Sequence, residues 1–314
     1  MNFLADCRAF FKKLYHNKSA LLAFVVVSLY VAAAVGVEIY DVVCRSNDIV
    51  PAYAVEHPEE IFSPPSARHW LGTDYLGRDC LLRAVGGIAT AVKVGVTASV
   101  IAAVIGVTLG LLAGYCGGRT DSFIMWLYST FAAMPTLLFI LAFALLFTKD
   151  YLAESLTVPL KVLAGALNTE PGMLAVYLAI GLTGWVSLCR VTRAETMKLK
   201  HHTFVNAAKV SGVSNTVIIF RHILPNIMHL VIIYFTLRFA YAVMTEVLVS
   251  YLGLGVQSAP SWGIMISDGQ ERLWRGVWWE VAAASGFMFV LVLSLNLLGD
   301  GLRDITDPKS TRRQ

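Results

Sequence analysis

The chain has 314 residues, of which 57% are hydrophobic and only 15% are charged. Soluble domains carry about 25% charged residues, so this composition excludes an ordinary soluble protein and indicates a membrane protein. The formal net charge of +4 calls for no nucleic-acid partner, because basic residues gathered at the cytoplasmic face of a membrane protein account for it.

Six segments are apolar and long enough to cross a bilayer, which takes about 20 residues. They predict an all-α membrane protein with a cytoplasmic N-terminus (1–20), a first transmembrane helix (21–43), an external loop (44–88), a five-helix core (89–304) and a cytoplasmic tail (305–314). The predicted spans are Leu21–Val43, Ala89–Tyr115, Phe123–Phe147, Met173–Leu188, Ile227–Leu254 and Val281–Leu298.

The distribution of Lys and Arg predicts which side each loop faces, because these residues favour the cytoplasm. With the N-terminus inside, the inner segments hold Arg8, Lys12, Lys13, Lys18, Arg119, Arg190, Arg193, Lys198, Lys200, Lys209, Arg221, Arg303, Lys309, Arg312 and Arg313. The outer segments hold only Arg45, Arg68, Arg78, Arg83, Lys149, Lys161, Arg272 and Arg275. Both termini and the segment 193–225 are therefore expected to face the cytoplasm.

The first apolar run is longer than the core of a typical cleavable signal, so we expect it to be a retained span. The five cysteines show no metal-binding spacing. Cys44 and Cys80 both fall on the expected outer side, and a disulfide between them is left open.

The external loop ends in a motif in which two glycines, two carboxylates and an arginine suggest a folded turn at the membrane surface. This run resembles the GTDxxGRD signature of dipeptide/oligopeptide permeases, matched at Gly72, Thr73, Asp74, Gly77, Arg78 and Asp79. We expect a structural turn held by Asp–Arg contacts, with direct substrate binding as the alternative.

The second predicted span carries small residues at every fourth position, a pattern that lets membrane helices touch. They are Ala98, Ala102, Gly106, Gly110 and Gly114. Their partner is expected to be either another helix of the same chain or a second subunit. In the third span, Pro135 is expected to produce a kink. The following external loop, Thr148–Gly172, is apolar in the middle but interrupted by proline and glycine, so we expect it to lie in the membrane interface.

The cytoplasmic segment after the fourth span predicts two short helices joined at Gly212, which can adopt the left-handed conformation that ends a helix. The first helix places Phe204, Ala207, Ala208 and Ser211 on one face, and the second is expected to end or kink at Pro225. The segment resembles the EAA loop of ABC-transporter permeases, matched at Ala207, Ala208, Gly212, Ile223, Leu224 and Pro225, although Asn206 stands where the motif begins with Glu. The resemblance implies a coupling helix that receives the motion of a cytoplasmic ATPase.

The fifth span contains two charged residues, Arg238 and Glu246, about two helical turns apart on nearly the same face. Charges at this depth are costly and should face a partner or a wet cavity. They are expected to line the translocation pathway, with a structural ion pair or an interface anchor as the alternative. The run Tyr251–Gly255 that follows resembles the SFLGLG element of the same family.

The resemblance covers roughly residues 66–308 and includes Pro260–Gly263 and Asn296–Pro308. It implies the type I importer permease fold and one transmembrane subunit of a bacterial ABC importer of the dipeptide/oligopeptide/nickel type, in the inner membrane. The implied partners are a second homologous permease, two cytoplasmic ATPases that bind ATP and Mg²⁺, and an external substrate-binding protein.

No catalytic residue, metal site or bound cofactor is expected in this chain, because the sequence contains neither a phosphate-binding loop nor a nucleophile–base pair in recognisable context. A stand-alone secondary transporter and an intramembrane enzyme are the rivals. The first would require inverted repeats and the second a polar cluster at one depth, and the sequence shows neither. The substrate is left open between peptides, nickel and other small solutes.

Overall fold

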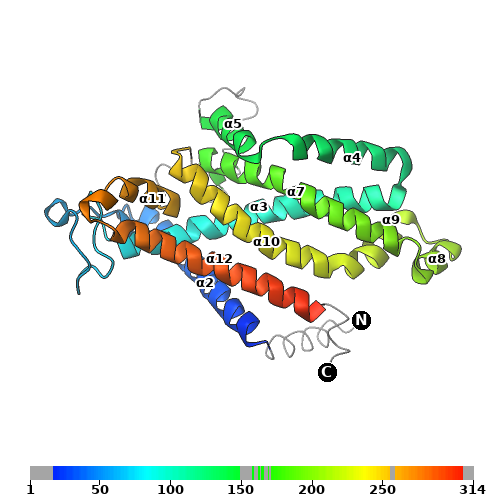
Figure 1. The fold of residues 1–314 in the computed structure, drawn as a ribbon, viewed down its shortest axis with the longest axis horizontal. Coiled ribbons are helices and arrows are strands. Elements are labelled where there is room, and N and C mark those ends of the chain that lie inside the picture. The colour runs from blue at the N-terminus through cyan, green and yellow to red at the C-terminus, as the bar shows by residue number, and fades with distance from the viewer. Residues whose placement is uncertain are drawn as a thin grey trace.

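The computed structural model describes residues 17–148, 171–254 and 259–306, together with five isolated positions between 158 and 169. In this part of the chain the regular elements are helices, and Figure 1 shows the longer ones gathered into one elongated bundle. The helices are α2 (Lys18–Ser46), η1 (Ala52–Ala54), η2 (Pro58–Glu60), α3 (Cys80–Cys116), α4 (Gly118–Ala133), α5 (Thr136–Thr148), α7 (Pro171–Leu199), α8 (Thr203–Val210), α9 (Asn215–Val217), η3 (Ile218–Ile223), α10 (Leu224–Tyr251), α11 (Trp262–Gln270), η4 (Leu273–Arg275) and α12 (Trp279–Thr306).

Five helices are long and apolar enough to cross a membrane, and the pair α4–α5 makes a sixth if it counts as one bent span. The prediction of an all-α protein with up to six spans is confirmed. Three boundaries differ clearly, since α3 begins at Cys80 instead of Ala89, α7 continues beyond Leu188 to Leu199, and α12 continues beyond Leu298 to Thr306. In each place the helix continues beyond the apolar run through a stretch that contains charged residues, so hydrophobicity alone underestimates its length.

The third predicted span is not one helix. The chain bends by 87° between α4 and α5, and Met134 has extended dihedral angles, φ −80° and ψ 133°. A residue that precedes proline is pushed out of the helical region, which is why α4 stops before Pro135. The kink expected there is therefore a complete break.

The stripe of small residues on α3 packs against α7 within the same chain. A Cβ atom added at Gly110 or Gly114 would lie 2.7 Å from the side chain of Thr192 or Thr196, and one at Gly106 would lie 2.8 Å from a carbonyl of α7. The two helices can therefore approach only because these positions lack side chains. This decides between the two partners left open by the sequence.

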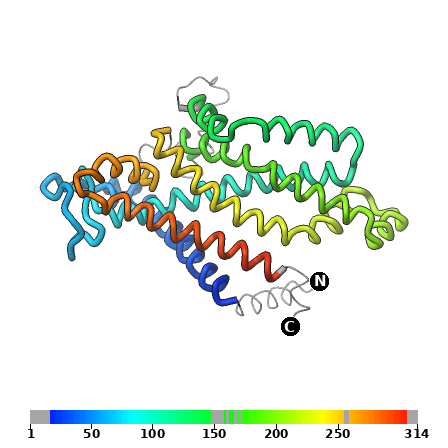
Figure 2. The backbone as a smooth tube through the Cα atoms, viewed as in Figure 1, coloured from blue at the N-terminus to red at the C-terminus, as the bar shows by residue number. Residues whose placement is uncertain are grey.

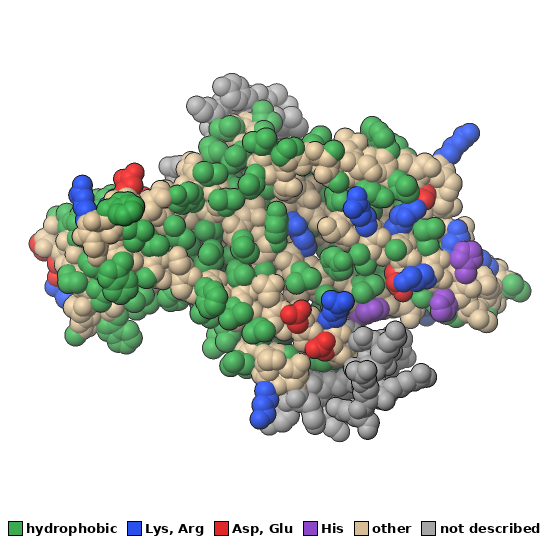
Figure 3. Space-filling model, viewed as in Figure 1, with side chains coloured by type: hydrophobic (Ala, Val, Ile, Leu, Met, Phe, Trp, Pro, Cys, Tyr) green, Lys and Arg blue, Asp and Glu red, His purple; other side chains and the backbone are tan. Residues whose placement is uncertain are grey.

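The core lies between α3, α7, α10 and α12, while α2 lies along the outside of α3 and α12 (Figure 2). Apolar side chains such as Leu22, Leu29 and Ile39 on α2 are largely exposed, and Figure 3 shows hydrophobic side chains distributed across the visible face. Such a surface suits contact with lipid. Ala20 of α2 touches the backbone near Gly301 of α12, so the start of α2 and the end of α12 lie together, towards the end of the bundle that carries α8.

Several expectations fall outside the described residues: the N-terminus before residue 17, most of the loop Thr148–Gly172, the glycine at 255 and the tail after 306. Cys44 and Cys80 are both buried free thiols, so the disulfide left open by the sequence is not formed.

Candidate functional site

The short helix α8 stands at one end of the bundle and closes with a well-defined cap. Gly212 has φ +76°, its amide donates to the carbonyl of Lys209, and the amide of Val213 donates to that of Ala208 at 3.1 Å. This pair of bonds is the Schellman motif, which requires a left-handed residue where the glycine stands. The sequence thus folds locally into a helix that stops and turns at Gly212.

The two faces of α8 differ from the sequence interpretation. Val205 and Ala208 are buried against the bundle, at 0% and 8% exposure, whereas Phe204 is 38% and Val210 is 90% exposed. Ala207 is exposed as well. Ala208 therefore does not share the outer face with Phe204 and Ala207, and the outer face consists of Phe204, Ala207 and Val210, called here the α8 outer face. Helical spacing alone is compatible with Ala208 on either the outer or the buried face of α8. Ala208 lies one turn from the buried Val205, and this places it on the buried face.

The second helix of this segment does not end at Pro225. After the short α9, the chain passes through a π-helical turn, η3, and continues as α10, in which Pro225 lies in the first turn. Proline is tolerated there because its missing N–H is not needed. Ile223 is fully buried and Leu224 packs against the same cluster, so both residues attach the segment to the bundle.

The segment that contains α8 and α9 is attached to the end of α3 through Tyr115. Its hydroxyl donates to the side-chain carbonyl of Asn215 at 2.7 Å, and the ammonium groups of Lys200 and Lys209 lie 5.7 Å and 5.4 Å from its ring. Because Tyr115 is 6% exposed, these contacts hold the segment against a fixed point of the bundle.

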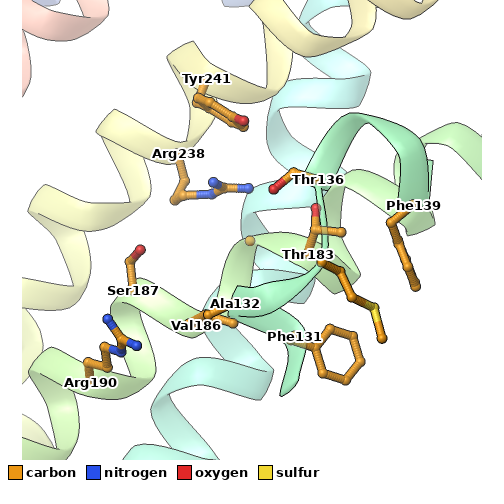
Figure 4. A pocket seen from close by; sticks show the side chains of 12 residues that line it. Phe131, Ala132, Thr136, Phe139, Thr183, Val186, Ser187, Arg190, Arg238 and Tyr241 are labelled. Atoms are coloured by element: carbon orange, nitrogen blue, oxygen red, sulfur yellow. The ribbon is translucent and has the colours of Figure 1, made fainter. Parts of the chain in front are cut away.

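A cavity of about 450 Å³ opens where α4 breaks from α5. Figure 4 shows it between this break, α7 and α10. Its walls are formed by Phe131, Ala132, Met134, Thr136, Phe139, Thr183, Gly184, Val186, Ser187, Arg190, Arg238 and Tyr241. Small-molecule sites commonly have volumes of about 300–1,000 Å³, and this cavity falls in that range.

Arg238 extends from α10 into this cavity. One of its terminal nitrogens lies 3.4 Å from the carbonyl of Ile180, its guanidinium lies 4.7 Å from the ring of Tyr241, and its Nε is buried without a hydrogen-bond partner. The guanidinium can lie here only because residue 184 is a glycine, since a Cβ atom at Gly184 would lie 2.0 Å from it. No ion pair of Arg238 is found among the described residues.

Glu246 lies elsewhere. It is 2% exposed, and its Oε1 accepts hydrogen bonds from Ser250 at 2.7 Å and from Ser261 at 2.9 Å. It therefore joins α10 to the start of α11. Among the described residues Arg238 and Glu246 do not pair with each other, since the contacts of each side chain are with other groups.

At the opposite end of the bundle from α8, Asp74 is the centre of a network made of residues 57–83 with Arg272, Trp279 and Glu280, called here the external clamp after the loop that the sequence predicts to be external. Its carboxylate is fully buried and accepts bonds from the backbone amides of Leu76 and Arg78, from Arg78 Nε at 2.7 Å and from Arg83. Asp–Arg contacts thus close the turn.

The external clamp joins segments that are far apart in the sequence. Arg83 is also 3.3 Å from Glu280 of α12, which in turn lies 3.5 Å from Arg272. Trp279 donates from its indole nitrogen to the carbonyl of Thr73 at 2.9 Å. Sequence reasoning missed Arg83, Arg272 and Glu280, although charged residues at the ends of apolar helices are a usable signal for such contacts.

The two glycines of the motif are required by their surroundings. Gly72 and Gly77 have φ of +66° and +76°, and an added Cβ would lie 2.7 Å from the Trp279 ring or 1.9 Å from the carbonyl oxygen of His57, respectively. Asp79 caps α3 by accepting from the amide of Leu82. Its other oxygen lies 2.8 Å from His69, whose second ring nitrogen is 3.0 Å from Glu60.

Among the described residues, no three His, Cys, Asp or Glu side chains lie close enough together to hold a metal ion. The same residues form an exposed apolar face on α8, a cavity whose Arg238 has no ion pair with any of them, and a network of buried ion pairs around Asp74.

Comparison with known proteins identifies the kind of molecule. Residues 106–312 match the family described as binding-protein-dependent transport system inner membrane component. The chain is 34% identical over 303 residues to the dipeptide transport system permease protein DppC of Bacillus subtilis (strain 168), covering 96% of this chain and 85% of that one. It is 31% identical over 294 residues to the oligopeptide transport system permease protein OppC of the same organism, covering 93% and 86%.

The oligopeptide transport system permease protein OppC of Escherichia coli (strain K12) is 36% identical over 242 residues, which cover 77% of this chain and 72% of that one. The family match spans well over half of the chain, and its helices provide five or six candidate crossings. The chain therefore belongs to the binding-protein-dependent transport system inner membrane components, and it is a multi-pass protein of the bacterial inner membrane.

Proposed function

We propose that this chain is a transmembrane permease subunit of an ATP-driven importer of dipeptides or oligopeptides. The similarity to permeases named for dipeptide and oligopeptide transport, over nearly the whole chain, supports this substrate class above nickel or another small solute. The working unit would contain a second homologous permease, two cytoplasmic ATPases that hydrolyse ATP with Mg²⁺, and an external substrate-binding protein. This chain supplies no hydrolysis of its own.

The observation that carries the proposal is the α8 outer face. A helix that projects from a membrane bundle with exposed Phe204, Ala207 and Val210 suits docking into an apolar groove of a soluble partner. On its other side, Val205 and Ala208 pack into a buried cluster that contains Leu111 and Tyr115 of α3 and Ile227 of α10. A push on α8 would therefore be transmitted to α3 and α10, and the residues 193–225 would serve as the coupling loop on the cytoplasmic side.

We propose the orientation in which α8 faces the cytoplasm. Placing α8 in the cytoplasm puts both described chain ends, at the start of α2 and the end of α12, on that side as well. The external clamp then faces outward, where a binding protein would deliver the peptide. The cavity at the α4–α5 break would form part of the translocation pathway, with Arg238 on its wall and Glu246 as a structural residue behind it.

The test is to place a charge on the α8 outer face. We expect Val210→Glu to insert normally but to lose co-purification of the ATPase and ATP-dependent peptide uptake, because a carboxylate would have to be buried in the docking groove. Gly212→Val should also fail, since a β-branched residue is strained at φ +76°. The control is Lys209→Ala, which removes only a cation–π contact with Tyr115 worth about 0.5–1 kcal/mol.

If Val210→Glu and Gly212→Val both bind the ATPase and transport like the unmodified protein, α8 is not the coupling helix. Ala208→Glu is no substitute for Val210→Glu, because Ala208 is buried against the bundle and its replacement would disturb folding as well as docking.

A further inference from the structure

The cavity at the α4–α5 break has a one-sided charge. Arg190 and Arg238 are among its lining residues, and no acidic side chain is among those the structure describes. Arg190 lies against the ring of Tyr128 at 4.7 Å, at the edge of the cavity. Arg238 is the deeper of the two, and its guanidinium points towards the start of α5 (Figure 4).

The guanidinium of Arg238 has unused hydrogen-bonding capacity. It carries five N–H donors, yet among the described residues its hydrogen bonding is one long bond to the Ile180 carbonyl, and Nε is buried without a partner there. A charged group held inside the membrane without a counter-charge is costly. Among the described residues no carboxylate neutralises this charge, so an anion bound in the cavity would complete the site.

The break between α4 and α5 adds to this preference. The first amides of a helix have no intrahelical partners and carry partial positive charge. Here they belong to α5, which begins at Thr136 on the cavity wall opposite Arg238. Helices broken at mid-membrane and pointing their N-terminal ends at anionic groups are a recurring device in transporters.

The depth of Arg238 in the membrane indicates whether the anion is a lipid phosphate or a transported solute. It lies near the middle of α10, which runs from Leu224 to Tyr251. At 1.5 Å per residue each end of the helix is about 20 Å away. A lipid phosphate belongs to the headgroup layer, beyond the hydrocarbon core that is about 30 Å thick, so a solute crossing the membrane is the better source.

We propose that Arg238 binds the C-terminal carboxylate of the peptide as it passes through this cavity. The inference rests on the proposed function, because the carboxylate belongs to the transported dipeptide or oligopeptide. Arginine binds carboxylates through two parallel hydrogen bonds, and Arg238 is one of the residues that line the cavity. The site would hold the end common to all peptides and leave the variable side chains free.

The experiment measures uptake by cells that contain the complete transporter, with a dipeptide and its C-terminal amide as the two substrates. Arg238→Gln should reduce uptake of the free acid about tenfold, the size expected for one lost charge-assisted hydrogen-bonded pair, and should change uptake of the amide less than about twofold on the same scale. Arg238→Lys should restore part of the free-acid uptake because it keeps the positive charge. Arg119→Gln, at an exposed position at the start of α4, is the matched control and should change neither.

The outcomes separate the inference from the function on which it rests. If the unmodified transporter takes up neither peptide, the proposed function fails. If it takes up the dipeptide but Arg238→Gln reduces acid and amide equally, the anion is not the peptide carboxylate, and a lipid phosphate or a general packing role replaces it. If Arg238→Gln no longer co-purifies with the second permease, Arg238 is an interface residue and the inference is overturned.

Discussion

Two arginines of this protein lie inside the bundle in opposite chemical circumstances. Arg83, in the external clamp, contacts Asp74 and Glu280 and approaches Asp268 at 3.9 Å. Arg238, at the α4–α5 cavity, has a carbonyl, an aromatic ring and no ion pair among the described residues. Arg83 has its carboxylate partners within the chain, so that removing it would leave buried charges uncompensated. Arg238 has no such partner among the described residues and can bind an anionic ligand.

The largest expected effect comes from removing each arginine in turn. Arg83→Leu leaves the buried carboxylates of Asp74 and Glu280 without their shared cation, and we expect it to destabilise the protein by about 3–5 kcal/mol. Arg238→Leu leaves no carboxylate behind, so its effect on stability should stay within about 1 kcal/mol, of either sign. Thermal unfolding of the purified transporter measures both. Equal losses of stability would remove the distinction on which the comparison rests.

Glu246 provides an intermediate case, because its buried carboxylate is satisfied by two serine hydroxyl groups and by no cation. Glu246→Leu should destabilise the contact between α10 and α11 by about 2 kcal/mol, since both hydroxyls lose their acceptor. Glu246→Gln retains an acceptor oxygen and should cost less than half as much. Unfolding midpoints and peptide uptake of both variants distinguish a structural role of Glu246 from a role of its charge in transport. A Gln variant that is stable but inactive would show that the charge serves transport, which the hydrogen bonds alone do not suggest.

The smallest effect concerns pH and the outer part of the external clamp. The carboxylates of Asp79 and then Glu60 raise the pKa of His69. Protonated His69 therefore stabilises the folded clamp fully below the unfolded-state pKa of about 6.5, and this stabilisation is lost as the pH rises through the higher folded-state pKa. The midpoint temperature of unfolding should therefore decrease as the pH is raised from 6 to 8.5. The His69→Gln variant should show a smaller decrease. His57→Gln, at a more exposed histidine, should leave it unchanged.

The sequence predicts the parts of this molecule that depend on local patterns. Apolar runs locate the spans, the four-residue spacing of Gly106, Gly110 and Gly114 locates a close helix contact, and the glycine at 212 locates the end of α8. Each of these depends on residues within a few turns of one another, where helical geometry alone gives the answer.

The parts that the sequence did not predict depend on distant partners. Arg83 meets Glu280 across 197 positions, and nothing in either local sequence indicates the other. The spacing predicts Ala208 on the exposed face of α8, whereas it lies on the buried face with Val205. Which face is buried depends on contacts with α3 and η3, which the local sequence does not contain. Pro135 predicts a disturbance, but the size of the bend depends on how α5 packs against α7.

The helix α3 has a mechanical consequence. It runs for 37 residues without a break, about 55 Å at the rise of an α-helix, from the cap at Asp79 to the Tyr115–Asn215 hydrogen bond. A continuous rod has only rigid-body freedom, and the bare-backbone contact with α7 resists its rotation about its own axis. A tilt of α3 about a point between its ends therefore displaces Tyr115 and Asp79 in opposite senses, which couples the two ends of the molecule to each other.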